Sequence, residues 1–359
     1  MILNKYASTK RIWIWLVVIV SLCILIGGKC VNEFAEKSRK EKLYEELQED
    51  LKDVCPGIIC WGDSLTVGTG GDGVNYPDVL EKLIQEKLMP EALEDVPVIE
   101  VINMGVGGED TNTILGRNGA VPFVVSEDFV IPEGKEAIDI MFSSANGKNV
   151  APLRQDNAGM ESVEINGVLG EIQVIQGSYT SNEYSYTFTR SKSGDAVEVL
   201  AGTPIITSGA EIGTDYWTVI FIGENGGYDT PAELIKQQRA IIEHQTANNE
   251  KYIIVGLHTG TAEEREGLEK AMAAEYGEKY INLREYLCTE GLETAGLKGT
   301  EEDIMMMQRG MTPASLMIED KCHFNEHGYR IIGKLIFDRM DQLGYFEQIK
   351  NTVEIIAVE

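Results

Sequence analysis

The chain has 359 residues, enough for one large domain or two ordinary ones, and its hydrophobic fraction of 43% is that of a globular protein. Its formal net charge of −27 argues against nucleic acid as a partner, because phosphate binding requires clustered lysine and arginine side chains. The six cysteines include no CxxC pair, which argues against structural zinc.

Residues 12–28 form an almost wholly apolar segment behind a short N-terminal tail that carries Lys5, Lys10 and Arg11. The segment is at the short end for a membrane span, and either a cleaved signal peptide or an uncleaved signal anchor would fit it. No Ala-x-Ala cleavage site follows, and Lys29 stands where a lipoprotein box needs a small residue, so we favour the anchor. The basic tail then predicts a membrane-anchored, single-pass protein whose bulk is extracytoplasmic, at the cell surface, or a secreted one if residues 1–29 are cleaved.

Residues 30–54 are rich in glutamate, lysine and leucine. Leu43, Leu47 and Leu51 recur every four residues, while charged side chains fill most of the other positions. This pattern predicts an amphipathic helix that acts as a stalk or packs on the following domain. We interpret its charges as a solvated face rather than a binding site.

From Cys55 onward, short apolar runs alternate with segments of helical spacing. This alternation predicts a parallel sheet with helices on both faces, in which the turns that follow the strands lie along one edge. Strands are expected at 58–61, 98–104, 217–222, 252–257 and 280–283, and helices at 76–89, 230–248, 263–276 and 326–343.

Between residues 113 and 214 the helical periodicity disappears and short runs of alternating residues replace it. Asn166-Gly167 between two such runs is a strong hairpin signal, because both residues tolerate the positive φ of a type I′ turn. We therefore expect a small inserted β-domain at 113–214, which interrupts an α/β domain formed by 55–112 and 215–346. Residues 347–359 are assigned to a C-terminal tail.

Ser64 lies in the sharp turn Gly-Asp-Ser that follows the first predicted strand, at the sheet edge where open α/β folds place reactive groups. A serine nucleophile needs a base, a group that orients the base, and donors for the oxyanion. Three further turns, at 105–111, 223–227 and 320–323, belong to the same predicted edge. The candidates that they supply are His323 as base, Asp320 as its orienting partner, and the Asn225 amide with the backbone N–H groups of Ser64 and Gly108 as oxyanion donors.

Gly-Asp-Ser-Leu at 62–65 resembles the first sequence block of the GDSL, or SGNH, hydrolases. Residues 103–111 are similar to the second block, Gly-Glu-Asn at 223–225 to the third, and Asp-Lys-Cys-His at 320–323 to the Asp-x-x-His block. The resemblance covers about 55–115 and 215–345, and it implies a three-layer α/β/α fold and a serine esterase. By that resemblance Ser64 is the nucleophile, His323 the base and Asp320 its partner, with Ser64, Gly108 and Asn225 at the oxyanion hole.

The chain departs from the family in two places. Gly226 stands where many members have aspartate after the asparagine, and the long β insertion is absent from minimal members. The resemblance implies no metal and no organic cofactor. It leaves the substrate open, because the insertion has no counterpart in those minimal members.

Two other patterns in the sequence resemble known sites but lack a required feature. The glycine-rich stretch 68–73 lacks the Gly-Lys-Ser/Thr ending of a phosphate-binding loop. His323 to His327 matches the H-x-x-E-H pattern of zinc proteases, which requires a helix already formed at His323. Asp320 before His323 and Gly328 after His327 instead predict that His323 precedes the helix.

By analogy we expect the ester substrate to be an O-acetylated cell-surface or extracellular polysaccharide. The alternatives are a lysophospholipase or thioesterase of the same family, and a surface glycan-binding or scaffold protein whose β insertion is the functional module. Buried free thiols are the favoured state of Cys55, Cys60, Cys288 and Cys322, although Cys55–Cys60 or Cys288–Cys322 bonds are compatible with export.

Overall fold

The structure is a computed structural model that describes residues 34–93, 97–144, 147, 150, 159–176, 185–245 and 250–358. The apolar segment predicted at 12–28 lies outside these residues. Within the described part of the chain, no helix combines the length and apolar character that crossing a membrane requires.

A parallel five-stranded sheet forms the centre of the molecule, with the strand order β14-β13-β12-β1-β2. Gly62 at the end of β1 pairs in register with Gly105 of β2 and Phe221 of β12, so the three strands end at the same edge. The strands agree with those expected from the sequence, although several are shorter. Their bounds are β1 Ile58–Gly62, β2 Val101–Gly105, β12 Trp217–Phe221, β13 Tyr252–Val255 and β14 Tyr280–Ile281.

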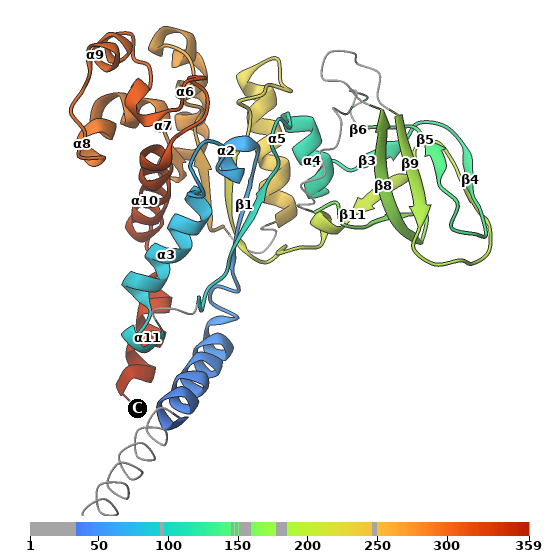
Figure 1. Ribbon diagram of the computed structural model, residues 1–359, viewed down its shortest axis with the longest axis horizontal. Helices are drawn as coiled ribbons and strands as arrows, with labels where there is room; N and C mark the ends of the chain where they lie inside the picture. The colour runs from blue at the N-terminus through green and yellow to red at the C-terminus, as the bar shows by residue number, and fades with distance from the viewer. Residues whose placement is uncertain are drawn as a thin grey trace, which may run out of the picture.

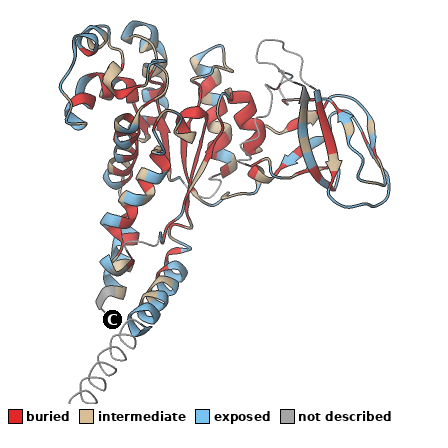
Figure 2. Ribbon diagram, viewed as in Figure 1, coloured by how far each residue is buried: buried red, intermediate tan, exposed pale blue. Residues whose placement is uncertain are grey.

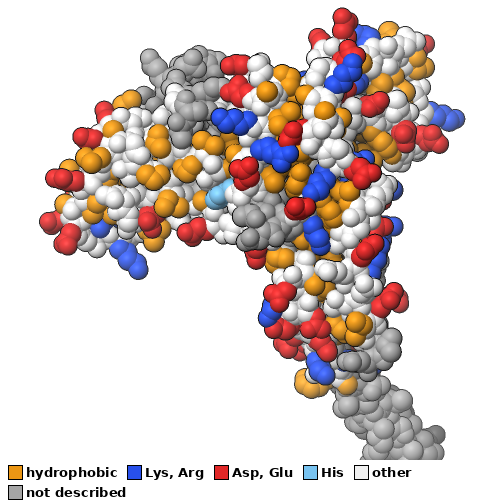
Figure 3. Space-filling view, turned by 180° about the vertical axis from the view of Figure 1, so that it is seen from behind, with side chains coloured by type: hydrophobic (Ala, Val, Ile, Leu, Met, Phe, Trp, Pro, Cys, Tyr) orange, Lys and Arg blue, Asp and Glu red, His pale blue; other side chains and the backbone are white. Residues whose placement is uncertain are grey.

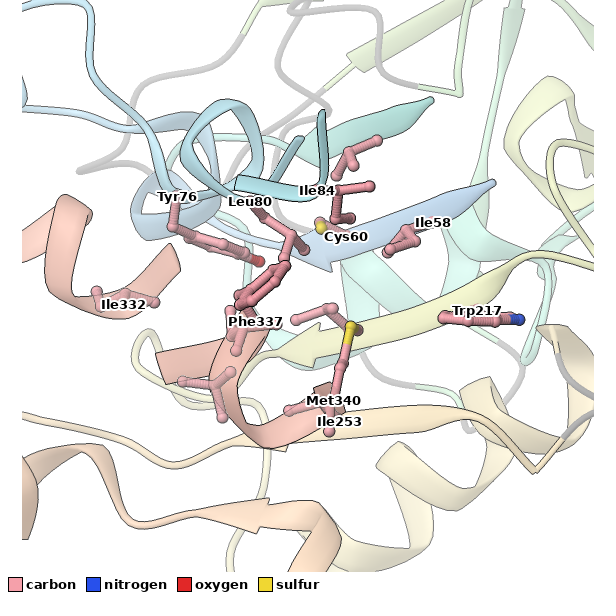
Figure 4. Close-up of a cluster of buried hydrophobic side chains, with 14 of the residues drawn as sticks. Ile58, Cys60, Tyr76, Leu80, Ile84, Trp217, Ile253, Ile332, Phe337 and Met340 are labelled. Atoms are coloured by element: carbon pink, nitrogen blue, oxygen red, sulfur yellow. The ribbon is translucent and has the colours of Figure 1, made fainter. Parts of the chain in front are cut away.

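Helices cover both faces of this sheet, as predicted, and give an α/β fold (Figure 1). Ile58 and Cys60 of β1 join the hydrophobic cluster under α3 and α10, whereas Ile59 and Trp61 join the cluster under α4, α5 and α6. Figure 4 shows side chains of α3 and α10 converging on the first face. The helix bounds are α3 Tyr76–Leu88, α4 Thr111–Asn118, α5 Pro231–Gln245, α6 Ala262–Tyr276 and α10 Glu326–Gln342.

Shorter helices follow β1 and β14. The helix α2 comprises Ser64–Val67, directly after the first strand. After β14 the chain forms α7 Leu283–Tyr286, α8 Leu292–Thr294 and α9 Glu301–Gln308. The last of these carries the methionine run 305–307, in which Met305 is exposed while Met306 and Met307 pack against the hydrophobic core.

Residues 123–207 are called here the β-rich segment, and its described residues form antiparallel strands with a hydrophobic cluster of their own (Figure 1). The predicted hairpin is confirmed, since Asn166 and Gly167 have φ values of 48° and 80° and connect β7 to β8. The segment begins later than the predicted residue 113, because α4 packs on the parallel sheet. Its strands are β3 Phe123–Val125, β4 Phe129–Ile131, β5 Ile138–Ile140, β6 Phe142–Ser144, β7 Val163–Ile165, β8 Val168–Gln176, β9 Ser185–Arg190, β10 Val197–Val199 and β11 Pro204–Thr207.

Helices at both ends of the described chain pack on the domain at the end opposite α2 (Figure 1). Residues 34–51 are helical, and Figure 2 shows this helix exposed over most of its length. Leu47 and Leu51 are buried in the core, so the helix packs on the domain through its last turns. The predicted tail is mostly a helix, α11 (Glu347–Val358), whose Ile349 is also buried in the core.

Candidate active site

The turn at Ser64 is built by two neighbouring residues. Gly62 ends β1, and a Cβ atom there would lie 2.0 Å from Thr66 Oγ1 and 2.6 Å from the Phe221 carbonyl oxygen, so no other residue fits without a shift. Asp63 caps α2, since its Oδ1 accepts a hydrogen bond from the Leu65 N–H at 2.9 Å. Ser64 is therefore the first residue of a short helix at the carboxyl end of a central strand.

Asp320, His323 and Ser64 form a continuous chain of hydrogen bonds. Asp320 Oδ2 lies 2.6 Å from His323 Nδ1, and His323 Nε2 lies 2.8 Å from Ser64 Oγ. Because an ionised carboxylate only accepts, Nδ1 carries the proton and Nε2 is free to accept from the serine hydroxyl. This is the arrangement in which an imidazole can remove the hydroxyl proton of a serine.

Local backbone structure holds Asp320 in place. Its Oδ1 accepts hydrogen bonds from the N–H groups of Cys322 and His323, each at 2.9 Å, and Lys321, which follows Asp320, has a positive φ of 58°. Burial acts to raise the pKa of Asp320, but the hydrogen bonds from the His323 side chain and from the two N–H groups together outweigh it. They lower the pKa of Asp320 to about 2.

His323 lies just before α10, as predicted. The helix begins at Glu326 after the N-cap Asn325, and His327 is in its first turn. The two histidines therefore do not share a helix face, which the H-x-x-E-H zinc site would require. In the described residues, no three His, Cys, Asp or Glu side chains form a group that could hold a metal ion.

The backbone N–H groups of Ser64 and Gly108 have no partner among the hydrogen bonds of the described chain. Gly108 has a φ of 79°, a left-handed conformation that favours glycine. It lies in the turn after β2, and the Val106 N–H in the same turn donates to the Gly62 carbonyl oxygen at 3.2 Å. The two turns thus present unengaged donors at one edge of the sheet.

Asn225 connects three of the strand-end turns. Its Nδ2 donates to the Glu109 carbonyl oxygen at 3.0 Å and to Asp63 Oδ2 at 3.3 Å. The structure thus brings the predicted donor to the edge that carries Ser64 and Gly108. Both amide hydrogens have partners here, so donation to an oxyanion requires Asn225 to share or release the longer bond to Asp63.

Several buried polar residues near this site were not singled out from the sequence. Asp63, Glu109 and Glu224 place three carboxyl groups close together beneath the turns, and Arg117 pairs with Glu109. Burial, followed by the like charges of Glu224 and Glu109, raises the pKa of Asp63 to about 7. Asp63, Glu109 and Glu224 lie in turns that the sequence had already indicated, and that position could have identified them as site residues. No sequence pattern near Arg117 could have done so.

His258 is buried and contacts the Asp320–His323 turn. Its Nε2 lies 2.8 Å from the Cys322 carbonyl oxygen, and its ring lies 4.1 Å from that of Phe324, centroid to centroid. Burial lowers the pKa of His258, which favours the neutral ring with the proton on Nε2. His258 follows closely after β13, and this position at a strand end could have identified it from the sequence as a residue near the site.

Cys55, Cys60, Cys288 and Cys322 carry free thiols in the described structure. Burial raises the pKa of Cys55 to about 12 and that of Cys322 to about 11. These thiols are therefore protonated at neutral pH, and none of them is activated as a nucleophile.

Comparisons with known proteins add little to this geometry. No protein-family model matches the chain, and a search of curated proteins finds no match. A solved structure described as "Peptidoglycan O-acetylesterase in action, 5 min" aligns at 12% identity with a TM-score of 0.29, over 83% of this chain and 95% of that one. We base no inference on a likeness with so low a TM-score.

Proposed function

We propose that this protein is a serine ester hydrolase of the SGNH type, with Ser64 as nucleophile, His323 as general base and Asp320 as the residue that orients His323. The observation that carries the proposal is the unbroken hydrogen-bond chain from Asp320 through His323 to Ser64 Oγ. The unengaged N–H groups of Ser64 and Gly108 support it, because acyl transfer also needs donors for the oxyanion.

In the proposed reaction, Ser64 Oγ attacks the ester carbonyl carbon while its proton passes to His323 Nε2. The carbonyl oxygen becomes an oxyanion that accepts from the N–H groups of Ser64 and Gly108, joined by Asn225. Collapse of this intermediate breaks the ester C–O bond, and the leaving alcohol takes the proton from Nε2. Water, deprotonated by His323, then attacks the acyl-enzyme, and the carboxylic acid is released as Ser64 regains its proton.

For the substrate we propose an acetyl ester on a cell-surface or extracellular polysaccharide. Two features support this finer proposal: the apolar segment at 12–28, as a membrane anchor, and the β-rich segment, as an inserted domain with its own core. The helix of residues 34–51 leaves the domain at the end opposite α2, so an anchored protein would direct its site away from the membrane (Figure 1).

The surface charge is compatible with a neutral glycan. On the face shown in Figure 3, basic side chains lie among acidic ones. A neutral acetylated sugar needs no strong field for binding, whereas a polyanion would need a basic surface. We therefore propose no nucleic acid or other polyanion as partner.

Hydrolysis of p-nitrophenyl acetate tests the catalytic proposal. The wild-type chain should turn over this ester, and Ser64→Ala should abolish turnover without changing the folded state measured by circular dichroism. Ser193→Ala, at an exposed serine of the β-rich segment, is the matched control and should retain full activity. Absence of turnover by folded wild-type protein would favour a binding or scaffold function instead.

Acyl-chain preference tests the substrate proposal separately. An acetylesterase should prefer p-nitrophenyl acetate to the octanoate and release acetate from O-acetylated polysaccharide. Preference for the octanoate, together with hydrolysis of lysophospholipid, would retain the serine mechanism and replace the polysaccharide with a lipid substrate.

A further inference from the structure

A buried ion pair, Arg117 with Glu109, contacts the turns of the candidate oxyanion site. The side chains of Arg117 in α4 and Glu109 are 1% and 2% exposed, and Arg117 Nε and Nη2 lie 2.9 Å and 2.7 Å from Glu109 Oε2. Burying two charges costs several kcal/mol of desolvation per ion, so a pair of this kind is weak evidence for stability by itself. The position of the Arg117–Glu109 pair beside the strand-end turns suggests that it serves to hold those turns.

The guanidinium of Arg117 contacts both turns that carry the proposed backbone donors. Glu109 directly follows Gly108, so the ion pair holds the residue next to one donor. Arg117 Nη2 also lies 3.4 Å from the carbonyl oxygen of Gly62, two residues before Ser64, which carries the other donor. The guanidinium lies 5.1 Å from the centre of the Trp61 ring, which restricts it further.

The same arginine is held from the opposite side by the β-rich segment. Thr207, the last residue of β11, donates its hydroxyl to the Arg117 carbonyl oxygen at 2.6 Å. The last turn of α4 is therefore fixed to the end of the β-rich segment, while the side chain of Arg117 reaches the strand-end turns. Arg117 thus connects that segment physically to the candidate site.

We propose that Arg117 is a positioning residue for the oxyanion hole, a role that rests on the proposed esterase function. Its planar fork sets the separation of the Gly62–Ser64 turn from the Gly108–Glu109 turn, and so the spacing of the two N–H donors. Oxyanion stabilisation requires donors about 2.7–3.1 Å from the developing charge, and displacement by about 1 Å costs about 100-fold in rate. A lysine keeps the charge but cannot bridge both turns in the same geometry.

The test is Arg117→Lys in the full chain, with p-nitrophenyl acetate as substrate. We expect kcat to fall by about 10- to 100-fold while KM changes little, because the donors act on the transition state. Affinity for phenylboronic acid, which forms a tetrahedral adduct on the serine, should weaken by a similar factor.

Arg284→Lys is the matched control. Arg284 on α7 and Glu269 on α6 form a second ion pair, in which Arg284 is buried, Glu269 is partly buried, and Arg284 also donates to the Gly310 carbonyl oxygen. This variant should lose comparable stability in urea denaturation yet keep kcat and boronate affinity. An equal loss of kcat in both variants, or kcat within threefold of wild type in Arg117→Lys, would overturn the proposal.

A second variant covers the case in which Arg117→Lys does not fold. Replacing both partners, Glu109→Gln with Arg117→Gln, removes the two charges of the pair together, so that neither is left buried without the other. We expect the folded double variant to lose kcat and boronate affinity to the same extent, and a double variant that retains both would contradict the proposal. If wild-type protein itself shows no Ser64-dependent hydrolysis, the proposed esterase function is wrong. If wild type is active and Arg117→Lys is equally active, only the proposed role of Arg117 is wrong.

Discussion

His323 Nε2 lies 2.8 Å from Ser64 Oγ, although 259 positions separate the two residues in the chain. Ser64 is placed by the end of β1, whereas His323 is placed by a hairpin-like turn in which the Ile318 N–H donates to the His323 carbonyl oxygen at 2.9 Å. His258 supports this turn from behind through the Cys322 carbonyl oxygen. The Nε2–Oγ distance is thus set by the elements that hold Ser64 and by those that hold His323. Substitutions in either set of elements can test its importance.

Asp320→Asn should lower kcat for p-nitrophenyl acetate by about 100- to 10,000-fold, because an amide cannot stabilise the imidazolium and can favour the wrong tautomer of His323. Steady-state kinetics at neutral pH measures the loss. Glu319→Gln, at the exposed neighbour, should leave kcat unchanged. Activity near wild type in Asp320→Asn would show that another group orients His323.

The stability of the protein should depend on Asp320 in acid. Its folded pKa of about 2 is below the ordinary value of about 3.9, so its contribution is present above about pH 4 and is lost as the pH falls through 2. The difference in urea midpoint between wild type and Asp320→Asn should therefore shrink as the pH is lowered from 5 towards 2. A difference that stays constant over that range would contradict the low pKa.

Asp63 should act in the opposite direction. Its folded pKa of about 7 is above the ordinary value, so its proton stabilises the fold fully below about pH 4 and this contribution is lost as the pH rises through 7. Asp63→Asn keeps a capping side chain without the titration. Its stability relative to wild type should increase between pH 4 and pH 8 in urea denaturation, and an equal difference at the two pH values would count against the raised pKa.

Asn225→Ala should lower kcat by about 100- to 1,000-fold if its amide serves the oxyanion, the loss typical of one side-chain donor. The amide also connects Asp63 to the Glu109 carbonyl oxygen, so some loss of stability is expected too. Kinetics well below the melting temperature separates the two effects. A variant that loses stability but keeps kcat would assign Asn225 to holding the turns alone.

Gly105→Ala should disrupt the contact between the first two strand-end turns. A Cβ atom at Gly105 would lie 2.3 Å from the Val67 nitrogen and 2.9 Å from the Asp63 carbonyl oxygen, and backbone atoms cannot move aside cheaply. We expect a loss of about 1–3 kcal/mol or more in the free energy of unfolding, together with lower activity. Gly267→Ala, at an exposed helical site with nothing near the new methyl group, should instead stabilise by up to about 1 kcal/mol.

Much of the fold could be predicted because its signals are local. Apolar runs that end in glycine turns indicated the strands, and helical spacing indicated α3 and α10. The boundary of the β-rich segment and the helical nature of α11 could not be obtained in this way, since α4 and α11 are short and become helices by packing on distant elements. Isolated helices of such length are marginal in water.

By itself, the sequence determined that Ser64, Asp320, His323, Gly108 and Asn225 stand in turns of a parallel α/β chain, because glycine, capping residues and apolar runs act over a few neighbouring positions. Only the tertiary structure decided which of those turns meet, and that Asn225 is engaged by Asp63 and the Glu109 carbonyl oxygen. It also revealed Arg117, whose role depends on burial beside Gly62 and Glu109. Buried contacts between distant segments have no period or spacing in the chain, so three-dimensional packing alone could show them.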